Sequence, residues 1–143
     1  MITKILIGED DPMMARLYEK VFNFEGYQVQ MAANGQDALD KAREFVPTLI
    51  ILDVMMPKLN GLAALEQIKA DPKLKDIPVV MLTNLAGQQD AESAIAKGAA
   101  KYIIKSEHDP REVAALVKEV LTSSGAAPSD SAAPSTPAAP PAA

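Results

Sequence analysis

Residues 49–53 have the sequence Leu49-Ile50-Ile51-Leu52-Asp53, in which four large apolar side chains lead directly to a carboxylate. Short unbroken apolar runs are typical of strands that are buried on both faces, as in parallel sheets. Three further runs have the same form: Ile5-Leu6-Ile7 leads through Gly8 to Glu9-Asp10-Asp11, Val79-Val80-Met81-Leu82 leads to Thr83, and Tyr102-Ile103-Ile104 leads to Lys105. Parallel strands end at one edge of an open sheet, where ligands bind, so these polar residues are predicted to share one site.

The segments between these runs carry apolar residues at helical spacing. Asp11-Pro12 predicts the start of one helix, and Asp109-Pro110 the start of another. Residues 27–31 alternate between polar and apolar, which favours a half-exposed edge strand, and we interpret Asn34-Gly35 only as a turn into a helix. The apolar positions of the five predicted helices are Met14, Leu17, Tyr18, Val21 and Phe22; Ala38, Leu39, Ala42 and Phe45; Leu62, Leu65 and Ile68; Ala91, Ala94 and Ile95; and Val113, Leu116, Val117 and Val120. Five strand–helix units in strict alternation predict a doubly wound α/β fold, a parallel five-stranded sheet with helices on both faces.

The composition divides the chain into a domain and a tail. Residues 1–123 contain the alternating pattern, whereas residues 124–143 are almost entirely Ala, Pro and Ser. A segment without large apolar side chains cannot form a core, and its repeated prolines prevent a helix. We therefore expect one domain, residues 1–123, followed by a disordered tail.

Charge and composition exclude several classes of function. The net charge is −5 and the sequence contains no cysteine, so direct DNA binding, thiol catalysis and thiolate metal sites are not expected. No apolar stretch approaches the length of a membrane span, and the N-terminus does not resemble a signal peptide. A cytoplasmic location is expected.

Three acids are predicted to form a metal site. Glu9 and Asp10 should face Asp53, and carboxylates packed together repel one another unless a cation lies between them. Oxygen ligands alone favour a hard ion, and Mg²⁺ suits a site of few carboxylates and water. Asp11 precedes Pro12 and is interpreted instead as a helix cap. Asp53 can accept a phosphoryl group as an acyl phosphate, and Lys105 can pair with its oxygens.

From Thr3 to about Ser123, the chain resembles the receiver domain of two-component response regulators. The resemblance rests on the acids Glu9-Asp10 before Asp11-Pro12, the segment from Asp53 to Gly61, Thr83, and Tyr102 placed three residues before Lys105. It implies the flavodoxin-like strand order 2-1-3-4-5, for which a member of this family is a standard example. It also implies Mg²⁺ as cofactor, a histidine kinase or phosphotransfer protein as phosphodonor, and a downstream protein as target.

The resemblance further implies a role for each residue. Asp53 is the phosphoacceptor, Asp10 binds Mg²⁺ directly, Glu9 binds it mostly through water, and the backbone carbonyl of Met55 is a further ligand. Lys105 binds the phosphoryl group, while Thr83 and Tyr102 form a switch pair that acts on the fourth helix, fifth strand and fifth helix. Ser106 follows Lys105 where the family usually has Pro, so whether this peptide bond is cis is left open.

The expected function is that of a stand-alone receiver, similar to the chemotaxis regulators and either a monomer or a weak phosphorylation-dependent dimer. Such a protein is not a conventional enzyme, because it catalyses only its own phosphorylation and dephosphorylation. The alternative is a haloacid-dehalogenase-type phosphohydrolase, which typically needs a second Asp where this chain has Met55. Met55 and Leu85 are predicted to flank the path of the hydrolytic water and, being apolar, to slow dephosphorylation.

Overall fold

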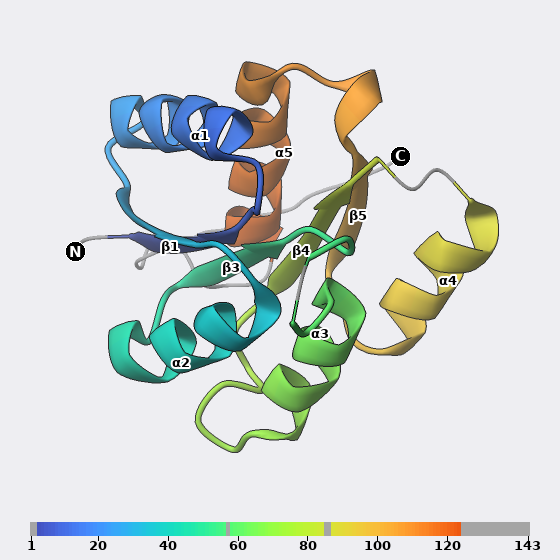
Figure 1. Cartoon of the computed structure of the whole chain (residues 1–143). Helices are drawn as coiled ribbons and strands as arrows, with labels where there is room; N and C mark the ends of the chain where they lie inside the picture. The colour runs from blue at the N-terminus through green and yellow to red at the C-terminus, as the bar shows by residue number, and fades with distance from the viewer. Residues whose placement is uncertain (1–2, 57, 85–86, 124–143) are drawn as a thin grey trace.

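The computed structural model describes residues 3–56, 58–84 and 87–123. Five parallel strands form one sheet in the order β2-β1-β3-β4-β5, so the predicted doubly wound fold and its strand order are confirmed (Figure 1). The strands are β1 Lys4–Gly8, β2 Gln28–Ala32, β3 Leu49–Leu52, β4 Val79–Thr83 and β5 Lys101–Ile104. The helices are α1 Pro12–Phe24, α2 Gly35–Phe45, α3 Gly61–Ala70, α4 Gln88–Ala96 and α5 Pro110–Ser123, with a short 3-10 turn at Lys105–Glu107.

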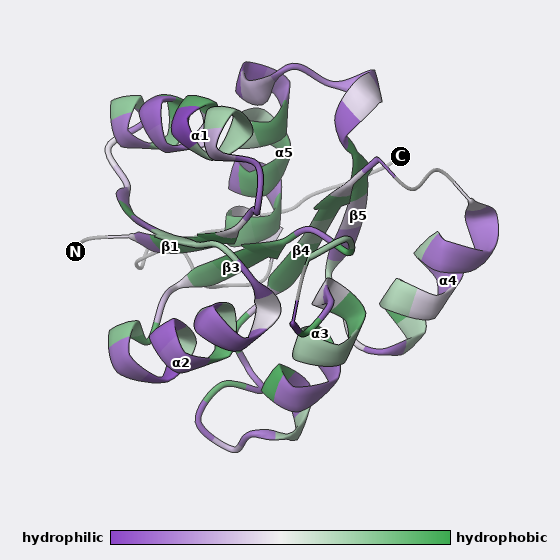
Figure 2. Ribbon diagram, viewed as in Figure 1, coloured by the Kyte–Doolittle hydropathy of each residue, from purple (hydrophilic) through white to green (hydrophobic). Residues whose placement is uncertain are grey.

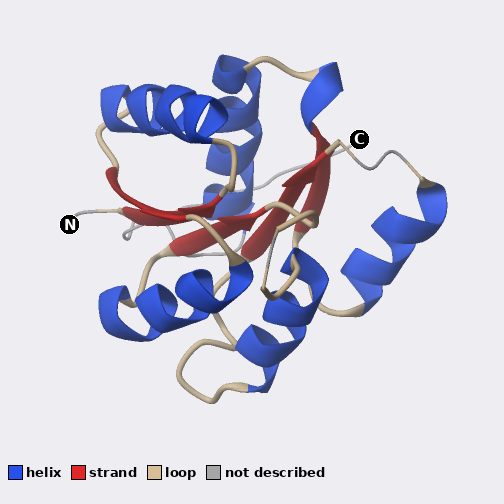
Figure 3. Ribbon diagram, in the orientation of Figure 1, coloured by secondary structure: helices blue, strands red, loops and turns tan. Residues whose placement is uncertain are grey.

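The helices cover both faces of the sheet, as Figure 3 shows. Successive side chains of a strand point to opposite faces. Ile5 and Ile7 therefore pack with α1 and α5, whereas Leu6 between them packs with α2 and α3. In Figure 2 the hydrophobic residues concentrate on the strands and on the helix surfaces that face them. Both faces of the central strands are buried, which is why their sequences are unbroken apolar runs.

The edge strand β2 follows the predicted alternation. Gln28 and Gln30 are exposed, whereas Val29 and Met31 are partly buried. Among the described strands it pairs with β1 alone, with Ile5 opposite Val29 and Ile7 opposite Met31. The prediction of a half-exposed edge strand is confirmed.

Polar caps fix the helix starts that position the site. The Asp11 carboxylate accepts a hydrogen bond from the Met13 N–H at 3.0 Å, which confirms its role as the cap of α1. Asn60 caps α3 by accepting from the Ala63 N–H at 2.9 Å. Asp109 and Glu112 cap α5 reciprocally, each accepting from the backbone N–H of the other.

The structure departs from the sequence-based predictions at Gly35 and Leu17, and it answers the open question about the bond between Lys105 and Ser106. Asn34-Gly35 is more than a turn, because a Cβ on Gly35 would lie 1.8 Å from the Leu59 carbonyl oxygen. Leu17 was predicted to be part of an apolar helix face, yet it is 43% exposed. No cis peptide bond occurs among the described residues, so the bond between Lys105 and Ser106 is trans. The predicted tail, residues 124–143, lies outside the described residues.

Candidate functional site

The backbone of the site is held by hydrogen bonds that extend the sheet beyond its strands. The Asp53 N–H donates to the Gly8 carbonyl at 3.1 Å, and the Glu9 N–H donates to the Ala32 carbonyl at 2.9 Å. Glu9 and Asp53 therefore stand at the carboxyl edge of adjacent strands, with little freedom of the main chain. This is the edge of a doubly wound sheet at which ligands bind.

The three predicted metal ligands lie together. Carboxylate oxygens of Glu9, Asp10 and Asp53 all lie within 4.8 Å of one another. Glu9 and Asp53 are buried, whereas Asp10 is exposed. These ligands are all oxygens, so the cluster fits a hard divalent cation such as Mg²⁺.

Lys105 reaches into the same cluster from the end of β5. Its Nζ forms ion pairs with Glu9 Oε1 and with Asp53 Oδ2, the latter at 2.6 Å. Burial alone lowers the pKa of Lys105, but its hydrogen bonds to the two carboxylates and their charges outweigh burial and raise it. Lys105 is therefore a charged ammonium that neutralises two buried acids.

Glu9 is held more tightly than its predicted role implies. Besides Lys105, it accepts a hydrogen bond from the Asp11 N–H at 3.1 Å. Burial raises the pKa of Glu9 in spite of the opposing effects of Lys105 and the Asp11 N–H. Glu9 is the least exposed of the three acids, with 4% of its surface accessible, whereas Asp10 faces solvent.

Thr83 and Tyr102 lie on adjacent strands near the cluster. Thr83 is fully buried at the end of β4, and Tyr102 is partly buried on β5, where it packs with the core on the side of α2, α3 and α4. Strand alternation places Thr83 on the same face as Met81, which is opposite Tyr102 in the sheet register. Burial raises the pKa of Tyr102, with smaller contributions from the charges of Asp90 and Asp53. The two residues thus share the face that α4 covers.

The loop after Asp53 contributes a backbone contact and a glycine that the sequence analysis missed. The Met55 N–H donates to Asp53 Oδ1 at 3.0 Å, while the Met55 side chain is 62% exposed. A Cβ on Gly61 would lie 2.2 Å from the Asp53 carbonyl oxygen, so only glycine lets α3 start this close to the acceptor. Nothing in the sequence distinguishes this role of Gly61 from that of an ordinary helix start. Leu85 lies outside the described residues.

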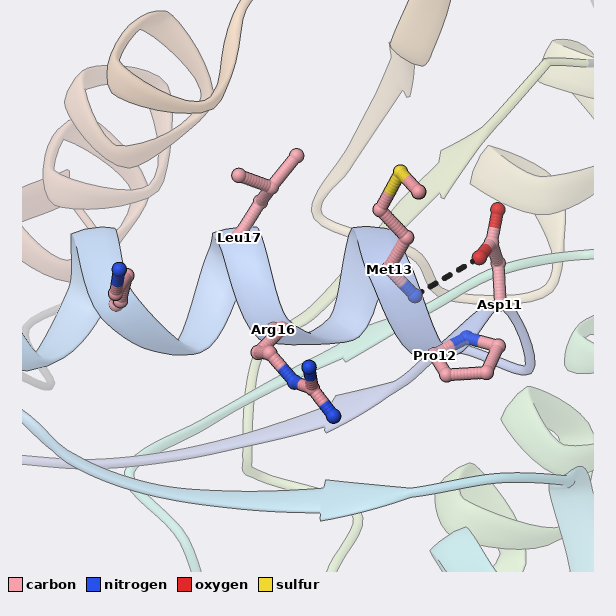
Figure 4. Close-up of a pocket in the computed structure, with 6 residues that line it drawn as sticks. Asp11, Pro12, Met13, Arg16 and Leu17 are labelled. Atoms are coloured by element: carbon pink, nitrogen blue, oxygen red, sulfur yellow. Dashed lines mark hydrogen bonds between the residues drawn. The ribbon is translucent and has the colours of Figure 1, made fainter.

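The first turns of α1 form a hollow next to the acids, lined by both apolar and charged residues. Its lining residues are Asp11, Pro12, Met13, Arg16, Leu17 and Lys20. Figure 4 labels the first five of them. Met13 is 72% exposed and Leu17 is 43% exposed. This surface adjoins the acid cluster, because α1 begins immediately after Asp10 and Asp11.

Comparison with known proteins gives a consistent result. The family model for the response regulator receiver domain matches residues 5–119. "Probable transcriptional regulator ycf27" of Porphyra purpurea is 36% identical over 118 residues, which are 82% of this chain and 47% of that protein. The chain thus spans about half the length of the curated relatives it matches.

Two solved structures have the same fold. A response regulator receiver domain protein described as CheY-like, from Methanospirillum hungatei, superposes with a TM-score of 0.80 at 26% identity, over 87% of this chain and 98% of its own. The signal receiver domain of a signal transduction histidine kinase from Syntrophus aciditrophicus has a TM-score of 0.78 at 32% identity, over 93% and 98%. Within the part of the chain that the structure describes, no helix has the length and apolar character needed to span a membrane.

Proposed function

The chain belongs to the family of response regulator receiver domains, and from this premise we propose that Asp53 accepts a phosphoryl group from a histidine kinase or phosphotransfer protein. The observation that supports Asp53 most strongly is the convergence of Glu9, Asp10 and Lys105 on its carboxylate. An oxygen of Asp53 forms the new bond to phosphorus while the bond between phosphorus and the donor nitrogen breaks. The product is an acyl phosphate on a buried side chain.

The cofactor in this proposal is Mg²⁺, held by Asp10, Asp53 and the Met55 carbonyl, with Glu9 nearby. When bound, the ion supplies positive charge that offsets the charge of the transferring group. Lys105 then turns from the Asp53 carboxylate to a phosphoryl oxygen, which its present distance of 2.6 Å from Asp53 Oδ2 allows with little movement. Thr83 donates its hydroxyl to another phosphoryl oxygen.

The output is a shift between two conformations of the domain. Thr83 and Tyr102 are the proposed switch pair, because they share the sheet face that α4 covers and lie on adjacent strands. The responding surface is that of α4, β5 and α5, to which a downstream protein or a second copy of the chain binds. Ile95 on α4 is 49% exposed and is available for such a contact.

We further propose that the domain acts on a protein target rather than directly on DNA. The net charge of −5 is unfavourable for binding a polyanion. The simplest test of the proposed function is intact-mass measurement after incubation with acetyl phosphate and Mg²⁺. One added phosphoryl group is expected, and no addition is expected in the presence of a chelator.

A docking prediction follows from the α1 hollow. Changing Met13→Glu together with Leu17→Glu should slow phosphotransfer from a phosphorylated donor protein by about tenfold or more, since truncating or charging central apolar contacts typically costs over 1 kcal/mol. Phosphorylation by acetyl phosphate, which needs no docking surface, should keep its rate. Stopped-flow or autoradiographic transfer assays measure both rates.

The matched control is Phe24→Glu, which introduces one such glutamate at the far end of α1, where Phe24 is 90% exposed. This variant should transfer like the wild type. Equal loss of rate with both donors in the double variant would show damage to the site itself and contradict the docking prediction.

A second prediction concerns the lifetime of the phosphoryl group. Met55→Asn with Leu85→Glu should speed self-dephosphorylation by about one to two orders of magnitude, ~1.4–2.7 kcal/mol of barrier. Amide and carboxylate groups can orient a water molecule in line with the phosphorus atom, whereas apolar side chains cannot. Phosphate release after removal of the donor gives the rate. An unchanged rate in the double variant would show that these positions do not govern water access.

A further inference from the structure

Tyr18 contains a buried hydroxyl for which the described residues provide no hydrogen-bond partner. The residue is 1% exposed on α1. A buried polar group without a partner destabilises the fold, and native structures contain few of them. Phenylalanine would fill the same space without that cost. Packing alone therefore does not explain why this residue is a tyrosine.

The position of Tyr18 relates it to the acid site. Its side chain belongs to the same buried cluster as Ile7, Ile51 and Ile103, on the face of the sheet that α1 and α5 cover. Because side chains two residues apart along a strand point to the same face, that face continues into the residues that follow these three by two positions. Those residues are Glu9, Asp53 and Lys105.

The direction of the helix favours an orientation of the hydroxyl toward these residues. Long side chains of an α-helix lean toward its N-terminus, and the N-terminus of α1 adjoins Asp10 and Asp11. The charges that act on the hydroxyl are those of Lys105, Glu9 and Asp53. Burial raises the pKa of Tyr18 to about 12, so the group remains a protonated donor at neutral pH.

Glu9 is the group that will need a donor. It is buried, and its charge is balanced in this structure by Lys105. A phosphoryl group on Asp53 draws the ammonium toward its own oxygens, which weakens the ion pair with Glu9. The Asp11 N–H, at 3.1 Å, is then the main donor left to this carboxylate. A carboxylate that loses a buried partner is strongly destabilised unless another donor replaces it.

We propose that Tyr18 is a positioning residue whose hydroxyl donates a hydrogen bond to Glu9 when Lys105 turns to the phosphoryl group. This inference rests on the proposed function, because it assigns Tyr18 a role in phosphorylation of Asp53. In this proposal the Tyr18 hydroxyl has no partner in the resting domain and donates to Glu9 in the phosphorylated domain. Tyr18 acts through Glu9 and Lys105 and does not touch the reacting atoms.

The test is Tyr18→Phe, with Tyr27→Phe as the matched control. Tyr27 is partly buried against the same hydrophobic cluster, but it precedes β2 at the opposite edge from the acids. For Tyr18→Phe we expect an unchanged or higher melting temperature without ligands, because an unpartnered buried hydroxyl is removed. Phosphorylation by acetyl phosphate at saturating Mg²⁺ should be about tenfold slower, the effect of losing a hydrogen bond to a charged group.

Two further measurements separate positioning from packing. Mg²⁺ with beryllofluoride, a phosphoryl mimic, should raise the melting temperature of the wild type and of Tyr27→Phe by more than it raises that of Tyr18→Phe. The wild type with this mimic should also show a slowly exchanging hydroxyl proton by NMR, which should disappear in Tyr18→Phe.

The outcomes distinguish the inference from the proposed function. If the wild type neither accepts phosphate nor responds to beryllofluoride, the proposed function fails, and the role of Tyr18 fails with it. If the wild type responds and Tyr18→Phe responds equally, only the role of Tyr18 is overturned. A lower melting temperature of Tyr18→Phe without ligands, or equal slowing in Tyr27→Phe, would show that the hydroxyl serves packing and would also overturn it.

Discussion

Asp53→Asn is expected to abolish phosphorylation, so that intact mass shows no added phosphoryl group after incubation with acetyl phosphate and Mg²⁺. An amide is a far weaker nucleophile than a carboxylate and cannot form the acyl phosphate. The fold should persist in this variant, because Lys105 keeps its ion pair with Glu9 and one of three mutually repelling acids is neutralised. Circular dichroism and a melting curve measure this persistence.

Asp11→Asn is the matched control for that experiment. It makes the same substitution on a neighbouring acid that caps α1, and Asn caps helices as well as Asp does. Phosphorylation of this variant should proceed at the rate of the wild type. Label that persists undiminished in Asp53→Asn would place the phosphoryl group on another residue and contradict the proposed function.

Gly61→Ala is expected to destabilise the domain by about 3 kcal/mol or more and to lower its melting temperature by about 10 °C. A Cβ at this position would lie 2.2 Å from the Asp53 carbonyl oxygen and 2.8 Å from its carbonyl carbon. Both are backbone atoms of a strand end that hydrogen bonds hold in the sheet, so neither can move aside cheaply. Thermal unfolding followed by circular dichroism gives the shift.

Gly8→Ala is the control that separates backbone conflict from loss of glycine as such. Its Cβ would meet the Leu52 Cδ2 at 3.0 Å and the end of the Met56 side chain at 3.3 Å. Both contacts involve the far ends of flexible side chains, so this variant should lose much less stability than Gly61→Ala. Similar losses in the two variants would mean that contact with the Asp53 backbone does not explain the cost.

The architecture could be predicted because the pattern of apolar and polar residues in each strand reflects how many of its faces are buried. Leu49 to Leu52 is apolar at every position because both faces of β3 are covered, and β2 alternates because it lies at an edge. The place of the site could also be predicted, since strands of one direction end together. Asp53 and Lys105 are 52 positions apart in sequence, yet each ends a strand of one sheet.

What could not be predicted depends on contacts between elements. The shared ion pairs of Lys105 with Glu9 and Asp53 require the register of three strands. The sequence does not show that Gly35 lies against the backbone of Leu59, or Gly61 against the backbone of Asp53. Both glycines follow an Asn in a pattern that is typical of any turn into a helix. Leu17 has the spacing of a core residue, but it is 43% exposed, so it lies at the margin of the buried face of α1.

The position of Lys105 bears on how the chain folds as well as on how Asp53 is phosphorylated. Two carboxylates inside the sheet edge already have a counter-ion, and that counter-ion is part of the chain. Some small domains remain unfolded until a metal arrives, because the metal supplies their charge balance. Because Lys105 already balances these two buried carboxylates, we expect the chain to fold without Mg²⁺. In the proposed function the ion acts on the folded domain, so we expect its supply to affect phosphorylation and to leave the amount of folded protein unchanged.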